Sequence, residues 1–559
     1  MSANLEIQVE NLDHLGLVAG IIDEIGIVEQ INQLVGEQPG EIVSPGHAVK
    51  AMILNGLGLV SSPLYLFSKF FSGKATEHLI GEGIKPEHLN DDRLGRVLDK
   101  LYLTGLEQIF TYIALGAAKK FKVSTNTTHL DSSSFSVHGE YENTRPEVSL
   151  LTGKNHSDNL TRELTNQRVA PQPISITYGY SRDHRADLKQ FIVDLICTGD
   201  GDVPLFLRVA DGDEADKAVF AQILCEFKQQ LNLNSLMVAD SALYSAANLV
   251  QMGELKWLSR VPLTVKQAKV LVSQLAETDL VSSQTKGYHW SQHKSRFAGI
   301  EQRWLVVQSE SRREADLCKW RQKLEKAEAE ANKKLRVLYQ QKFACKPDAL
   351  KAAKRLSQTL PYHNLTNVQT KELETKLSQK ASTKIEEWAG ITYQVQAQLE
   401  RDAEKVQRET QSAGRFVLAT NVLDVKEISN DEMLSNYKEQ QAAERGFAFL
   451  KDPLFFTDSV FLKSPERVSA LALLMGLCLL VYTLAQRQLR QTLKPSQSRL
   501  KNQLGKLTDR PTLRWIFQCF QSIHLLIFNG GKQISNLTDE RLGILRFFPE
   551  ACRRYYLLS

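Results

Sequence analysis

Between residues 125 and 264, short apolar runs alternate with amphipathic stretches, and this pattern constrains the fold more than any other in the chain. The apolar runs read THLDSSSFSVHG, ISITYGY, QFIVDLICTG, PLFLRVADGD, SLMVAD and KWLSRVP. Helical spacing over 215–231 and 245–252 separates the last three runs. The resulting order of three strands, helix, strand, helix and strand predicts an α/β core with a mixed sheet.

The regions on either side of this core have different patterns. Residues 1–122 show apolar positions at helical spacing and predict an all-helical N-terminal domain. The core begins in 123–264, is interrupted by a large insertion over 265–425, and resumes in helices over 426–490. Residues 491–559 are predicted as a basic, helical C-terminal segment.

The insertion combines strand-like runs, such as QRWLVVQSE and GRFVLATN, with a charged helical arm. Residues 311–337 hold 14 charged residues among 27, with apolar residues at helical intervals. This arm is predicted as a solvated helix, paired in a hairpin with the chain up to about residue 385. A contact with DNA or with a second subunit is the alternative interpretation.

Charge is distributed unevenly along the 559 residues. The whole chain carries 69 basic and 64 acidic residues, for a net charge of +5. Residues 1–120 hold 9 basic and 15 acidic residues, whereas residues 486–559 hold 13 and 4. The basic C-terminal segment fits a contact with nucleic acid or an acidic partner, and equally a solvated helix surface.

Two further features bear on the cellular compartment. Residues 468–485 contain no charge over 18 positions, which suits either a buried core helix or a single membrane span. Their Ser, Gly and Thr residues and the charges on both sides favour the core helix, and no membrane association is expected. The seven cysteines are scattered without CxxC pairs and the N-terminus has no secretory pattern, so we expect a reducing, cytoplasmic location.

Two aspartates are the first candidates for chemistry. Asp131 and Asp240 each lie at the end of an apolar strand-like run. Carboxylates at strand ends meet in the crevice where open α/β folds bind ligands. Oxygen ligands of this kind suit Mg²⁺, which also uses water and phosphate oxygens. One such aspartate would be an ordinary loop residue, but two on the same sheet predict a metal site.

A third acid lies in the segment 437–451, which has a helical pattern. At 100° per residue, Tyr437, Gln440, Glu444 and Lys451 fall within roughly 60° of arc on one stripe. A polar stripe is also what a solvated helix face presents. The stripe gains weight because Glu444 supplies the third ligand that Asp131 and Asp240 call for.

The spacing of this stripe resembles a known signature. Tyr-x2-Arg-x3-Glu-x6-Lys is typical of DDE transposases of bacterial insertion sequences, in the insertion-sequence 4 superfamily. This chain has Gln440 in place of the arginine. The flanking text HLDSSSFSVHGEYE, YGYSRDHRADLKQF, DGDEADK and MVADSALYS is similar to the insertion-sequence 1634 branch, and the likeness extends over nearly the whole chain.

The resemblance implies a ribonuclease-H-like catalytic core in which Asp131, Asp240 and Glu444 are catalytic and bind two Mg²⁺ ions, or Mn²⁺. It implies cleavage of the ends of the element and joining of the 3′-hydroxyl to target DNA, with a homodimer holding two ends. Tyr437, Gln440 and Lys451 would contact DNA, although glutamine cannot supply the cationic fork of arginine. The protein would be cytoplasmic and associated with the nucleoid when bound to DNA.

Other interpretations remain at this point. A structure-specific nuclease on the same scaffold would use similar acids without joining strands. An inactive DNA-binding relic and a helical scaffold protein are further alternatives. In the segment SRDHRADLKQ, residues Arg182, His184 and Arg185 suit either a DNA contact or a turn held by aspartate side chains.

Overall fold

The computed structural model describes residues 7–141, 171–231, 235–381, 384–452, 462, 464–528 and 531–558. The chain divides into two compact units, Met1–Leu258 with Asn436–Ser559, and Ser259–Ser435. The predicted insertion, 265–425, falls within the second unit. Each unit is described by itself.

A mixed sheet organises the first unit, as the alternating pattern predicts. Its strands run in the order β4-β3-β2-β5-β6. β2 is antiparallel to β3 and parallel to β5, and β3 is antiparallel to β4. The strands are β2 (Thr127–Val137), β3 (Lys189–Thr198), β4 (Pro204–Ala210), β5 (Leu236–Ala239) and β6 (Trp257–Val261). Only Trp257 and Leu258 of β6 belong to the first unit.

Helices cover both faces of this sheet, which explains why nine of the ten β3 residues are buried. On one face, Phe227 of α8 (Asp216–Leu231) packs edge-on against Phe206 of β4, with ring centroids 5.8 Å apart. On the other face, Gly446 of α15 (Gln441–Leu450) lies against Leu195 of β3. The helix α9 (Ala246–Met252) connects β5 to β6, as predicted.

Two details differ from the sequence prediction. Residues 174–180 do not form a strand; Thr177 makes one isolated antiparallel bridge to Gln190, because the following chain turns away into a loop. Asp131 is not at the end of its strand either, since β2 continues to Val137 against β3.

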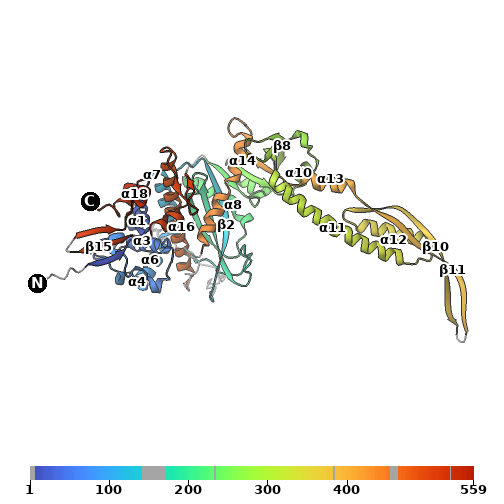
Figure 1. Ribbon diagram of the computed structural model, residues 1–559, viewed down its shortest axis with the longest axis horizontal. Coiled ribbons are helices and arrows are strands. Elements are labelled where there is room, and N and C mark those ends of the chain that lie inside the picture. Colours follow the sequence, from blue (N-terminus) through green and yellow to red (C-terminus); the bar gives the residue numbers. More distant parts are fainter. Residues whose placement is uncertain are drawn as a thin grey trace, which may run out of the picture. The chain divides into compact units, whose positions relative to one another are not determined.

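The uncharged segment forms the core helix α16 (Pro465–Leu493) of the first unit (Figure 1). It is long and apolar enough to cross a membrane, but 94% of its most apolar window is buried inside the structure. It packs against β4 and against helices α1, α3, α6 and α7. The predicted buried core helix is thus confirmed.

The N-terminal region is helical apart from one short strand. Its helices are α1 (Leu15–Ile25), α2 (Ile27–Val35), α3 (Pro45–Gly56), α4 (Phe67–Phe71), α5 (Thr76–Ile80), α6 (Asp91–Thr104) and α7 (Leu106–Lys120). The strand β1 (Gln8–Asn11) pairs with β15 (His524–Phe528) from the C-terminal segment. The prediction of an all-helical domain missed β1 because its partner lies some 510 residues further along the chain.

The C-terminal segment is mixed rather than helical. It contains α17 (Leu513–Cys519), α18 (Asp539–Leu545) and α19 (Glu550–Arg553). The strands β13 (Leu500–Lys501) and β14 (Leu507–Thr508) precede α17, and β15 and β16 (Gly531–Ser535) lie between α17 and α18. Several arginines here stabilise the fold, since Arg487 pairs with Asp200 and Arg514 pairs with Asp452.

The second unit combines an antiparallel sheet with helices and a ribbon. The sheet has the order β12-β9-β8-β7, from β12 (Arg415–Thr420), β9 (Ile300–Ser309), β8 (Tyr288–Phe297) and β7 (Val281–Ser282). The helices are α10 (Lys266–Gln274), α11 (Glu310–Gln340), α12 (Lys346–Thr359) and α13 (Ala403–Ser412).

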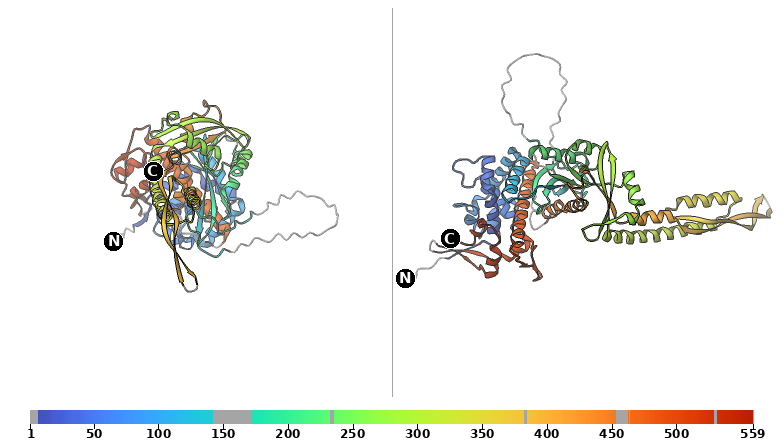
Figure 2. Two further views of the ribbon diagram at one scale, coloured as in Figure 1. Left: turned by 90° about the vertical axis from the view of Figure 1, so that its right-hand side faces the viewer. Right: turned by 90° about the horizontal axis from the view of Figure 1, so that it is seen from above.

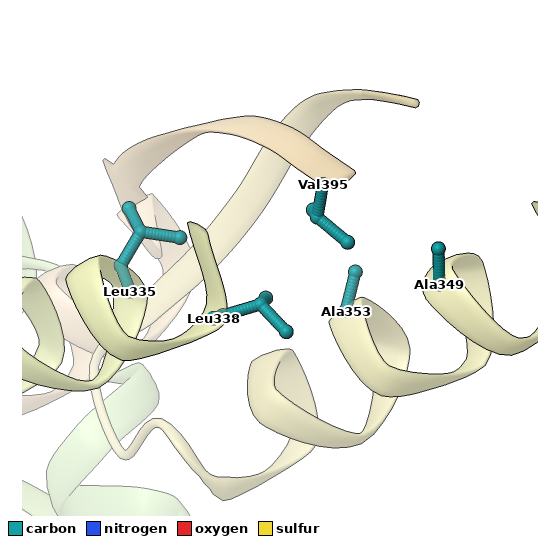
Figure 3. Packing of buried hydrophobic residues seen from close by; sticks show 5 residues of the cluster. All are labelled: Leu335, Leu338, Ala349, Ala353 and Val395. Atoms are coloured by element: carbon teal, nitrogen blue, oxygen red, sulfur yellow. The ribbon is translucent and has the colours of Figure 1, made fainter. Parts of the chain in front are cut away.

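The charged arm is confirmed as helix in α11, but the part of the predicted hairpin that follows α12 is not helical. Residues 363–401 form a two-stranded antiparallel ribbon, β10 (His363–Ala381) and β11 (Lys384–Arg401), which runs beside α11 and α12 (Figure 2). A small hydrophobic core joins these elements; it consists of Leu335 and Leu338 of α11, Ala349 and Ala353 of α12, and Val395 of β11 (Figure 3).

Candidate active site

The strand register brings Asp131 and Asp240 together. Leu130 of β2 lies opposite Ala239 of the parallel strand β5. Asp131 and Asp240 are the next residues on the two chains, so they occupy equivalent positions on neighbouring backbones. Adjacent strands lie about 4.8 Å apart, so the two side chains leave neighbouring backbones, and the charge of Asp240 acts on Asp131.

Backbone amides orient both carboxylates. The Asp131 carboxylate accepts a hydrogen bond from the N–H of Ser132 at 2.9 Å. The Asp240 carboxylate accepts one from the N–H of Ala242 at 2.8 Å, in the turn that leaves β5. These bonds restrict the side-chain rotamers of the pair, which lies at the carboxyl end of β5 in the middle of the sheet.

Glu444 approaches the pair from the helix α15. The buried face of this helix packs across β2 and β3; it consists of Ala442, Ala443, Gly446, Phe447 and Leu450. Phe447 lies 6.4 Å from Phe135 of β2, between ring centroids, on the same strand face as Asp131. Glu444 is exposed at the margin of this contact.

The pKa of Asp131 depends on the charges of both other acids. The pKa of Asp131 is raised to about 7, mainly by burial; the Arg182 charge and the Ser132 amide lower it, and the charges of Asp240 and Glu444 make smaller contributions that raise it. The side chain is only 16% exposed. Asp131 therefore interacts electrostatically with both of the other predicted acids.

The loop that contains the SRDHRADLKQ segment, for which the sequence left two interpretations, contacts β2 beside Asp131. The Arg182 guanidinium lies 3.4 Å from the Asp131 carboxylate, and the Arg182 amide donates to Ser134. The next residue, Asp183, accepts two hydrogen bonds from Lys451 Nζ, both at 2.8 Å. Arg185 instead pairs locally with Asp187. The SRD sequence was the signal for this loop, but only the fold reveals which partners it meets.

The predicted continuous helix over 437–451 is wrong. The helix α14 (Asn430–Lys438) ends before Glu439, and α15 starts at Gln441. Gln440 forms the turn between them and is 8% exposed. Its amide donates to the Leu130 carbonyl at 2.8 Å and lies 3.3 Å from His129 Nδ1. The side chain is thus held inside the protein, one residue from Asp131, rather than presented to DNA.

The other members of the predicted stripe lie closer to solvent. Tyr437 is half-buried on α14, and Lys451 is half-buried at the end of α15, with its Nζ 5.2 Å from the ring centroid of Phe135. Arg445 pairs with Asp202 through two bonds of 2.6 and 2.7 Å. It is therefore engaged away from the position that arginine has in the signature.

The chemistry of the donors suits a hard divalent cation. Within the described ranges, no group of three or more His, Cys, Asp or Glu side chains is arranged as a metal site. Mg²⁺ does not require such a group, because it usually binds one or two carboxylates and takes its other ligands from water and phosphate. Asp131 and Asp240 supply two carboxylates of this kind.

Comparisons with known proteins assign no activity. Residues 7–115, which span most of the N-terminal helices, match a domain of unknown function, DUF4277. No curated protein matches the chain. Among solved structures, one similar chain is from the cryo-EM structure of the piggyBac transposase synaptic complex with hairpin DNA. It shares 8% identity at a TM-score of 0.35, covering 91% of this chain and 79% of that one, which is too low to establish a common fold.

Proposed function

We propose that this protein is a DDE-type DNA transposase of the insertion-sequence 4 superfamily, in its insertion-sequence 1634 branch. It would cleave the ends of its own insertion sequence and join the freed 3′-hydroxyl to target DNA. Asp131, Asp240 and Glu444 would be the catalytic acids and would hold Mg²⁺ or Mn²⁺. A homodimer would hold the two ends, and the protein would act in the cytoplasm on nucleoid DNA.

The register of Asp131 and Asp240 carries this proposal. Asp131 and Asp240 directly follow the aligned residues Leu130 and Ala239 of two parallel strands, and the helix that carries Glu444 packs on β2 and β3. This arrangement supports a shared role for three acids that are over 300 positions apart in the sequence. The strand order β4-β3-β2-β5-β6, with β2 antiparallel to β3 and parallel to β5, supports a ribonuclease-H-like core.

The residues of the site have different proposed roles in cleavage and joining. Divalent cations on the carboxylates would polarise the phosphodiester and stabilise the departing oxygen. Water attacks the phosphorus at the element end, and the bond to the 3′ oxygen breaks. The new 3′-hydroxyl then attacks a phosphorus of target DNA and displaces the 3′ oxygen of the target strand. Arg182 supplies positive charge beside the phosphate, and no side-chain nucleophile is needed. Tyr437 and Lys451 would contact the DNA backbone, whereas Gln440 would position the helix that carries Glu444.

The decisive experiment is cleavage of a duplex that carries the element's own end in Mg²⁺. We expect Asp240→Asn and Glu444→Gln to reduce cleavage by about a hundredfold or more, because each removes charge from the reacting centre. Asp187→Asn is the matched control, since it removes an exposed carboxylate that pairs only with Arg185. Cleavage at the wild-type rate by either active-site variant would refute the assignment.

A pre-cut end distinguishes transposase from nuclease. With a 3′-hydroxyl already present and a supercoiled target, a transposase yields a joined product. Cleavage of the uncut end without any joining from the pre-cut end would favour the structure-specific nuclease instead. Binding without either reaction would indicate an inactive relic.

A further inference from the structure

The charge of the second unit changes abruptly along its two long helices. Residues 310–332 of α11 hold six basic and six acidic residues, whereas residues 333–355 hold eight basic residues and one acid. We call residues 333–355 the basic segment; it covers the last turns of α11, the link and most of α12.

The apolar side of α12 is already covered. Ala349 and Ala353 are buried against Leu335, Leu338 and Val395 (Figure 3). At 100° per residue, Lys351, Lys354 and Arg355 fall within about 100° of arc on the opposite side of the helix. All three are exposed. They therefore form a cationic stripe on α12, away from its packing contacts.

No acidic side chain in the described part of the chain pairs with this stripe. Lys346, at the start of α12, pairs with Glu372 at 3.6 Å, but Lys351, Lys354 and Arg355 form no such ion pair. The balanced half of α11 differs, because Arg313 pairs with Glu277 at 2.5 Å. Like charges three and four residues apart destabilise a helix, so an unneutralised stripe suits an external polyanion.

We infer that the basic segment is a second DNA-binding surface, which holds the phosphate backbone of duplex DNA independently of sequence and of the catalytic acids. The choice of duplex DNA among polyanions rests on the proposed function. An anionic membrane fits less well, because lipid-binding helices insert an apolar face, and here that face is packed inside the unit.

The test compares two triple variants of the full chain on a random-sequence duplex in EDTA. The first is Lys351→Gln, Lys354→Gln and Arg355→Gln. The control is Lys319→Gln, Arg321→Gln and Lys326→Gln, which removes the same charge from exposed positions in the balanced half of α11. Affinity is measured over a range of salt concentrations, with circular dichroism to verify folding.

We expect the α12 variant to bind about tenfold more weakly and to lower the slope of log affinity against log salt by about 3, since each phosphate contact contributes about 0.9. The control should change both quantities little. Equal losses in the two variants, or unchanged binding in both, would overturn the inference, as would a loss confined to anionic phosphatidylserine vesicles.

The outcome is separable from the fate of the proposed function. If the wild-type protein cleaves element ends but the α12 triple variant binds duplex DNA as tightly as the wild type, only the inference about the basic segment is rejected. Stripe-dependent binding by a protein that never cleaves its ends would reject the transposase alone.

Discussion

At the scale of single residues, Asp131 is placed where an ionised carboxylate is costly. Its pKa of about 7 means that burial and the charges of two other acids oppose ionisation in the folded protein. An asparagine would meet the same packing without the charge. The buried charge of Asp131 lowers the stability of the folded protein. Such a carboxylate suits a site in which bound cations would neutralise the charge.

We therefore expect Asp131→Asn to stabilise the protein in EDTA while abolishing cleavage. Because the folded pKa is raised above the unfolded value of 3.8, the wild type loses stability as pH rises from about 4 to about 7. The gain from the variant should be absent near pH 4 and approach about 4 kcal/mol above pH 7, at about 1.4 kcal/mol for each pKa unit between the two values. Urea unfolding at several pH values measures it.

The exposed Asp348→Asn provides the control and should show no gain that grows with pH. A loss of stability in Asp131→Asn at pH 8 would contradict the prediction. It would mean that the Arg182 contact outweighs the burial of the charge.

At the scale of elements, the turn between α14 and α15 positions the site. Gln440→Ala removes the bond to the Leu130 carbonyl and leaves that buried acceptor unpaired. We expect a loss of about 1–3 kcal/mol in the free energy of unfolding. Cleavage should fall about tenfold or more because Glu444 follows one turn later, with unchanged DNA affinity in EDTA.

Lys451→Ala distinguishes a role in DNA binding from a role in positioning Glu444. It removes a cation proposed to contact DNA, so it should weaken binding, where Gln440→Ala does not. Equal loss of DNA affinity in both variants would restore a direct DNA contact for Gln440.

The elements that sequence reasoning identified are those with a strong local period. The runs that became β2, β3, β4 and β5 have the apolar character of strands buried on both faces, α8 has apolar residues at helical spacing, and α16 comes from a long uncharged, apolar stretch. The errors arise where pairing with a distant segment determines the secondary structure. β10 is rich in Lys, Glu and Leu, which favour helix, and it is a strand because it pairs with β11.

The same reasoning explains what was found at the site. Asp131, Asp240 and Glu444 could be selected from sequence because their types and spacing carry the resemblance. The register that joins them, the Arg182 contact and the burial of Gln440 depend on long-range packing, which a single sequence does not encode locally.

Close packing between α1 and α19 gives a further test at this scale. A Cβ on Gly20 would lie 2.3 Å from the Cα of Cys552, so Gly20→Ala requires the backbone of α19 to move. We expect a loss of about 2 kcal/mol or more in stability. Gly543→Ala, in α18 with nothing within 4 Å, should instead be neutral or stabilising by about 0.5–1 kcal/mol. Thermal unfolding of both variants measures this, and equal effects would contradict the packing.

At the scale of the whole first unit, the two chain ends complete one structure. Tyr556 donates to the Asp13 carbonyl at 2.6 Å and accepts from the Leu17 amide at 3.1 Å. Lys50 pairs with Asp23 at 2.6 Å, and both contact the Tyr555 hydroxyl. The N-terminal helices and the C-terminal segment are therefore expected to unfold together with the sheet that carries the acids.

His14 makes that cooperativity depend on pH. Its Nε2 lies 2.8 Å from the Leu57 carbonyl, its Nδ1 lies 2.9 Å from Gln521 Nε2, and its ring stacks on Phe517 at 4.4 Å. Complete burial lowers the pKa of His14 from 6.5 to about 4. The neutral ring thus joins the start of α1 to the C-terminal segment.

Because the folded pKa lies below the unfolded one, the unfolded chain binds the proton first as pH falls. The contribution of His14 should be complete above about pH 6.5 and lost progressively down to about pH 4, by about 2–3 kcal/mol. His14→Gln should be less stable at pH 7 and flatter across this window. Urea unfolding from pH 4 to 8 measures the difference, and parallel curves for the two proteins would show that His14 is not the titrating group.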